Sequence, residues 1–237
     1  MYDAQTLLAA AHRIANEIAL LAYRRNKSNI SWPVAIAIMA GVTVIVVVGD
    51  RARKARHAKA TAALAVSHGL LPDNAPSGFP KGTFERIPAR SHLSNMLRDG
   101  ARPQERYGFL MSYRQGKTTV TRTVGAFRST VRHGHITLLR QGILGALNWK
   151  DIDIGDEEFD KRWIVKSDDP AYAHTALTPT VRAWLMTFED TFSAPTLEVR
   201  DGDVIAVIEG EHIERIPELL EAAETFERHL RASPRQP

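Results

Sequence analysis

The chain contains no cysteine among its 237 residues. Without thiols it can form neither a disulfide bond nor a thiolate zinc site, and thiol redox chemistry is excluded. It also lacks the Gly-x-Ser-x-Gly, His-Glu-x-x-His and dinucleotide-binding glycine patterns. The sequence therefore indicates no particular reaction, and we expect no catalytic residues, no cofactor and no resident metal.

Charged residues are absent from residues 28–49, and from Val34 to Val48 nothing is more polar than Thr43. As a helix this run would reach roughly 33 Å, enough for a hydrocarbon core of about 30 Å. A buried core helix, the alternative, would normally be shorter and carry a polar face. The run predicts a single-pass transmembrane helix, with Tyr23 and Trp32 as aromatic anchors at the two interfaces.

Basic residues are more numerous after this run than before it. Three precede it, at positions 24, 25 and 27, and five follow it closely. Because basic residues are retained on the cytoplasmic face, we expect a membrane protein with its C-terminal domain in the cytoplasm. We also expect the five to contact anionic lipid headgroups. They are Arg51, Arg53, Lys54, Arg56 and Lys59.

The N-terminal segment, residues 1–27, has the apolar spacing of an amphipathic helix. Its apolar residues recur at intervals of 4, 3, 4 and 3, at Leu7, Ala11, Ile14, Ile18 and Leu21. Such a face must be covered by the lipid interface, by a second copy or by another protein. We interpret it as a candidate partner-binding helix face.

The net charge of +4 conceals two halves of opposite sign. Residues 51–135 carry 16 Lys and Arg against 4 Asp and Glu, whereas residues 136–237 carry 11 against 20. One interpretation is a basic surface for anionic lipid or nucleic acid. The favoured one is that the two halves fold against each other and their charges interleave.

The remaining pattern predicts an α+β domain of mixed strands and helices, with antiparallel hairpins packed against two or three helices. The predicted organisation is an amphipathic helix over 1–27, a transmembrane helix over 28–49, a juxtamembrane basic helix over 50–71, a linker over 72–82, the α+β domain over 83–232 and a disordered tail over 233–237. Predicted strands are 83–87, 106–114, 118–127, 136–139, 159–165, 197–199 and 204–208. Predicted helices follow Asp169 and Thr178, the second reaching Phe192, and a last helix covers 213–230.

Two clusters could carry chemistry. Six acidic residues lie within residues 151–160, but an EF-hand starting at Asp151 would need Gly and Glu where Asp156 and Arg162 stand. We interpret the stretch as a solvated acidic turn, and His133 and His135 as an exposed turn. The alternative is a metal-assisted site that combines the acidic stretch with one of these histidines.

Aromatic and basic residues alternate in the predicted hairpin of residues 106–127. This could form a stacking platform for single-stranded nucleic acid. However, Tyr107, Phe109, Met111 and Tyr113 are two residues apart and share one face of a strand. We therefore favour their packing on a core.

The segment 151–185 resembles an uncharacterised bacterial family of membrane-anchored domains of unknown function. The resemblance lies in Phe159-Asp160-Lys161-Arg162-Trp163-Ile164-Val165, then Ser167-Asp168-Asp169, Ala173 and Leu177-Thr178-Pro179. It implies a bacterial membrane protein with an α+β domain and no established activity. With the cytoplasmic orientation expected above, the resemblance implies a location in the bacterial inner membrane.

Together these patterns favour an accessory or assembly component with a binding or scaffold domain. Its expected partners are the lipid bilayer and another membrane or cytoplasmic protein, or a second copy of the chain; nucleic acid is not expected. The alternatives are a metal-assisted enzyme with its site at 151–160, and nucleic-acid binding by residues 51–135.

Overall fold

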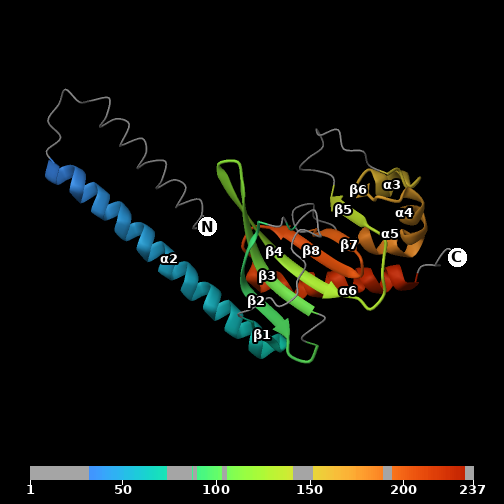
Figure 1. Cartoon of the computed structure of the whole chain (residues 1–237), viewed down its shortest axis with the longest axis horizontal. Coiled ribbons are helices and arrows are strands. Elements are labelled where there is room, and N and C mark those ends of the chain that lie inside the picture. The colour runs from blue at the N-terminus through green and yellow to red at the C-terminus, as the bar shows by residue number, and fades with distance from the viewer. Residues whose placement is uncertain are drawn as a thin grey trace, which may run out of the picture. The chain divides into compact units, whose positions relative to one another are not determined.

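The computed structural model describes residues 32–73, 87, 90–102, 106–140, 152–188 and 194–232 (Figure 1). In the first helix, side chains are described for Ala40, Gly41 and from Thr43 onward. In chain order the elements are α2 (Trp32–His68), β1 (Leu70–Pro72), β2 (His92–Asp99), β3 (Arg106–Gln115), β4 (Thr118–Arg128), β5 (Ile136–Arg140), α3 (Glu157–Asp160), β6 (Trp163–Lys166), α4 (Pro170–Ala176), α5 (Pro179–Leu185), β7 (Thr196–Arg200), β8 (Asp203–Glu209), the 3-10 turn η1 (Ile213–Arg215) and α6 (Ile216–Ala232).

The chain divides into two compact units, Met1–Lys59 and Ala60–Pro237. In the first unit, the described residues belong to α2. Neither Gly nor Pro occurs between Arg51 and Val66, which allows the helix to continue. The helix ends at His68, and Gly69 follows with a φ of 64°, a left-handed conformation that terminates helices.

The predicted transmembrane helix over residues 28–49 is wrong. No helix in the described part of the chain is long and apolar enough to cross a bilayer. The side chains that the structure describes in the apolar part of α2 run from Ala40 to Gly49, Val42 excepted. Charged residues then begin, with Asp50 and Lys54 paired at 2.7 Å.

The second unit is built on one eight-stranded antiparallel sheet with the order β1-β2-β3-β4-β8-β7-β5-β6. Three hairpin connections, β2–β3, β3–β4 and β7–β8, place consecutive strands side by side. The β7–β8 turn uses Asp201 and Gly202, both at positive φ, as the Asp-Gly pair predicts. The predicted α+β class is therefore confirmed, without the transmembrane helix.

Both faces of the sheet are buried. Helices α3, α4, α5 and α6 supply the partners on one face, where Phe159, Val181, Leu185 and Phe226 share a core with the strands. The fully buried Phe109 and Met111 lie on the opposite face, together with Ile87. Strand β8 is consequently buried without interruption from Val204 to Ile208.

Helix α6 lies close to the sheet because the strands beneath it present small residues. Gly108 of β3 is paired with Gly125 of β4, and Gly125 is paired on its other side with Ala206 of β8. A Cβ added at Gly125 would meet the backbone of Leu219 at 2.6 Å and that of Leu220 at 2.7 Å. This row of small residues therefore determines how near α6 can pack.

Most of the predicted elements are present. Strands predicted over 106–114, 118–127, 136–139 and the hairpin over 197–208 correspond to β3, β4, β5, β7 and β8. The caps are also confirmed, because Asp169 accepts from the Tyr172 amide and Thr178 from the Val181 amide. The last helix extends to Ala232.

Three element predictions are wrong or incomplete. Phe159 lies in α3, because Asp156 caps that helix by accepting a hydrogen bond from the Phe159 amide. The helix after Thr178 ends at Leu185. Strand β2 was missed, because its polar residues and a register shift between Ser94 and Leu97 break the alternation. The predicted strand 83–87, apart from Ile87, lies outside the described residues.

Candidate functional site

The β3–β4 hairpin extends beyond the strands on both of its sides. The two strands pair continuously from Arg106 with Phe127 to Gln115 with Thr118. Strand β2 pairs with β3 only as far as Ser112, and β8 pairs with β4 only from Arg122. Residues 113–121 therefore form a two-stranded ribbon that projects from the sheet (Figure 1).

Arg122 holds the base of this ribbon. Its side chain is buried, and its Nε donates to Glu209 Oε1 at 2.9 Å. The guanidinium carbon also lies 5.1 Å from the centre of the Tyr113 ring, within the range of a cation–π contact. These contacts tie β4 to both of its neighbouring strands and give the ribbon a defined direction.

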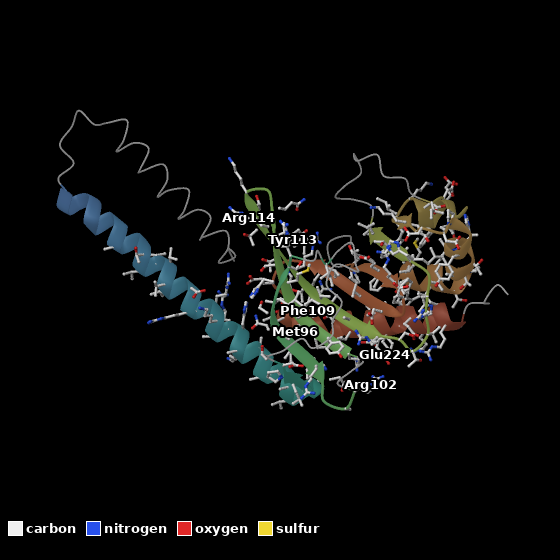
Figure 2. All side chains as sticks on the ribbon, viewed as in Figure 1. Met96, Arg102, Phe109, Tyr113, Arg114 and Glu224 are labelled. Carbon is white, nitrogen blue, oxygen red and sulfur yellow. The ribbon has the colours of Figure 1, made fainter. Side chains whose placement is uncertain are left out.

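The tip of the ribbon is exposed and basic. Arg114, Gln115, Lys117, Thr118 and Thr119 are all exposed, and residues 113–121 include no Asp or Glu. Figure 2 shows Tyr113 and Arg114 on the projecting part of the hairpin. Within the described residues, no strand pairs with the outer edge of β3 after Ser112 or with the outer edge of β4 before Arg122. Such open edges present backbone groups to which another chain can pair, although edge Lys residues also discourage unwanted pairing.

The basic and acidic halves of the chain fold against each other, as the favoured interpretation predicts. Arg102 and Arg106 both pair with Glu224, at 3.2 and 3.6 Å. Arg128 pairs with Asp203 at 2.9 Å, and Arg122 pairs with Glu209. Four of the cations of residues 51–135 therefore have carboxylate partners in residues 136–237.

The aromatic residues of β3 pack on the core. Phe109 and Met111 are fully buried, and Tyr107 and Tyr113 are partly buried against the same cluster. The prediction that this face serves the core is therefore confirmed. Stacking of nucleobases would require these rings to be exposed, and Phe109 is not.

The acidic stretch uses its carboxylates to shape its own loop. Asp153 Oδ1 accepts from the Gly155 amide at 2.7 Å, and the two Asp160 oxygens accept from the Ile154 and Asp156 amides. Lys161 pairs with Glu157 at 2.7 Å. Within the described ranges, which omit Asp151, no group of three or more potential metal ligands is arranged to hold an ion.

His133 is buried, which corrects the prediction of an exposed turn. Its Nε2 lies 3.5 Å from Oε1 of Glu227, whose side chain is only 4% exposed. Ser129 Oγ also donates to Glu227, and Arg231 Nη2 donates at 2.7 Å. Glu227 thus joins α6 to the loop after β4.

His135 belongs to a different cluster. Its Nδ1 lies 3.1 Å from Asp168 Oδ2, and its Nε2 lies 3.6 Å from Oε1 of the fully buried Glu198. Asp168 also accepts from Arg200 at 2.9 Å. The two histidines therefore face different carboxylates, and neither is joined to the acidic stretch by these contacts.

We expect the stability of the second unit to decrease as the pH rises above 6.5. The neighbouring Glu198 carboxylate raises the pKa of His135, burial opposes this rise, and the Asp168 carboxylate adds to it. A histidine whose pKa is raised contributes stability below its ordinary pKa, and the contribution disappears as the pH passes the higher value. Melting temperatures of the wild type and His135→Gln between pH 5.5 and 8.5 check this. An equal slope for both proteins would contradict it.

The structure describes only some of the residues predicted to contact lipid or a partner. Those of the predicted lipid-contact group lie along α2, and all except the partly buried Arg53 are exposed. Trp32 is the first residue of α2, and its side chain is not described. Tyr23 and the apolar face of residues 7–21 lie outside the described residues. Their proposed roles remain predictions.

The ribbon was missed as a site by sequence reasoning. The turn of Gln115, Gly116 and Lys117 predicts the hairpin, and Gly116 has a φ of 62° as that turn requires. How far β2 and β8 extend beside the hairpin depends on pairing between distant segments. Local composition carries no signal for it.

Comparison with known proteins gives one informative likeness. Neither the protein-family models nor the curated proteins include a match to this chain. Among solved structures, the fold is similar to that of the mycobacterial trehalose monomycolate transport factor A, TtfA. The TM-score is 0.52 at 16% sequence identity, over 76% of this chain and 98% of that one. At this identity the likeness shows a shared fold, and that fold occurs in a bacterial protein.

Proposed function

We propose that this chain acts by binding, as an accessory component of a bacterial transport or assembly process. The observation that carries the proposal is the likeness of fold to TtfA, which extends over nearly the whole of that chain. TtfA is named as a transport factor, and the sequence contains no catalytic pattern that would favour an enzyme. The resemblance of residues 151–185 to a bacterial family with no established activity is in keeping with it.

We propose the ribbon of residues 113–121 as the surface that contacts the partner. Its exposed tip carries Arg114 and Lys117 without a compensating carboxylate within the ribbon. Basic charge on a projecting element favours encounter with an acidic surface, and open strand edges can then pair with it. The partner we propose is accordingly a second protein with an acidic face.

Reversal of both charges, Arg114→Glu with Lys117→Glu, should reduce co-purification of the partner about tenfold or more, because like charges then face each other. The measurement is affinity purification of the tagged full chain from the bacterium that carries its gene, after mild crosslinking, with quantitative mass spectrometry. The variant should fold normally, since Arg114 and Lys117 are exposed. Circular dichroism checks this.

The matched control is Arg132→Glu with Arg162→Glu, an equal change of charge on exposed positions of the second unit outside the ribbon. Recovery of the partner should be unchanged in the control. Equal recovery with the ribbon variant would refute the ribbon as the contact surface. Light scattering on the purified chain tests self-association, because a dimer that the ribbon variant dissociates would make the partner a second copy.

A further inference from the structure

A pocket of about 360 Å³ lies at the end of the sheet opposite the ribbon. It is lined by Phe127 and Arg128 at the end of β4, by Thr130 in the following loop, by Arg102 from the β2–β3 connection, and by Glu224, Glu227, Arg228 and Arg231 of α6. Figure 2 shows Arg102 and Glu224 at this end and Arg114 at the other. All of these residues belong to the second unit.

Arginine dominates the charge of this pocket, with four guanidinium groups against two carboxylates. The two glutamates orient two of the arginines. Arg102 donates to both oxygens of Glu224, at 3.2 and 3.4 Å, and Arg231 donates to Glu227 through Nε and Nη2. Arg128 is held in the same way by Asp203. These three side chains remain 41%, 47% and 40% exposed, so a ligand can reach them.

Arg228 differs from the other three. It lies on α6 one turn after Glu224 and three residues before Arg231, which places it on the same side of the helix. Its side chain is exposed, and it forms no ion pair with any residue in the described ranges. Its charge is therefore available to a ligand in the pocket.

We propose that this pocket binds the phosphate group of a phosphorylated ligand. Guanidinium groups present planar pairs of N–H donors that match phosphate oxygens, and several at one concave site are typical of phosphate recognition. The Thr130 hydroxyl is a further donor on the lining, and Phe127 supplies an apolar wall. The inference goes beyond the proposed function and does not rest on it.

Basic residues near the end of a helix also offset its dipole. That role alone would explain Arg228 and Arg231 on the last turns of α6 without a ligand. It does not explain why Arg102 and Arg128, from two other segments, line the same cavity. A ligand titration separates the two explanations.

The test is an NMR titration of the isotope-labelled full chain at constant ionic strength with three probes: inorganic phosphate, glycerol 3-phosphate and a short-chain phosphatidic acid below its micelle concentration. Saturable shifts should appear at the amides of Arg128, Thr130 and Arg228. Similar affinities for the first two probes would identify a free phosphate as sufficient. Tighter binding of the third would identify a lipid headgroup as the source.

Arg228→Ala should weaken binding of the best probe about tenfold, because one charge-assisted interaction is lost. Its matched control is Arg162→Ala, which removes the same charge from an exposed position outside the pocket lining and should leave the affinity unchanged. Shifts that do not saturate, or equal affinities for the wild type and Arg228→Ala, would overturn the proposal. Because no residue of the ribbon lines the pocket, the failure of this inference and that of the proposed function remain distinguishable.

Discussion

Gly125→Ala should destabilise the second unit by about 3 kcal/mol, because the added methyl group would overlap the backbone of α6. The nearest atoms are Leu219 C at 2.6 Å and Leu220 N at 2.7 Å. Backbone atoms cannot move aside without shifting the whole helix. Urea denaturation followed by tryptophan fluorescence measures the loss, since Trp163 is buried in the same unit.

Gly108→Ala provides the matched comparison. Its added methyl group would meet the side chain of Ile216 instead of backbone. In an Ile216→Ala background, Gly108→Ala should therefore cost much less than it does in the wild type, whereas Gly125→Ala should cost the same. If Ile216→Ala rescued both glycine variants, the close approach of the α6 backbone to Gly125 would be refuted.

Glu227→Gln should cost about 3 kcal/mol, because it removes the charge from a buried group that several partners surround. The side chain is 4% exposed and accepts hydrogen bonds from Ser129 and Arg231, with His133 at 3.5 Å. Thermal and urea denaturation at pH 7 measure the loss. Glu221→Gln, on the exposed side of the same helix, is the control and should change stability by less than about 0.5 kcal/mol.

The same variant should alter the response to acid. Burial alone would raise the pKa of Glu227, but the hydrogen bonds from Ser129 and Arg231 outweigh it and lower the pKa below its ordinary value of 4.5. The contribution of this carboxylate is therefore present above pH 4.5 and is lost as the pH falls through the lowered value. Glu227→Gln should show a shallower decrease in stability below pH 4.5. A slope equal to that of the wild type would argue against the assignment.

The elements that could be predicted from sequence are those whose signals are local. Asp169 and Thr178 cap their helices by accepting hydrogen bonds from backbone amides three residues further along the chain. The turn between β7 and β8 is formed by two adjacent residues, Asp201 and Gly202. The apolar side of α6 follows its own periodicity. Strand β1, which includes Pro72, has three residues and pairs at the edge of the sheet, where Pro is tolerated. Its sequence does not indicate a strand.

The candidate sites depend on contacts between distant segments, which explains why sequence reasoning missed them. Arg102 meets Glu224 across 122 positions, and Ser129 meets Glu227 across 98. The sequence predicts that the charges of the basic and acidic halves interleave, but it does not indicate which residues form the ion pairs. The apolar run of residues 28–49 predicts a transmembrane helix from local properties, its hydropathy and length, but no helix in the described part of the chain meets that description.

We propose that the ribbon of residues 113–121 contacts a partner protein, and this contact can be captured in the cell. The most direct measurement is photo-crosslinking in the cell from an unnatural amino acid placed at Lys117, with Glu221 on α6 as the control position; both side chains are exposed. We expect a discrete adduct with one protein from position 117 and none from position 221. The same adducts from both positions, or none from position 117, would contradict it.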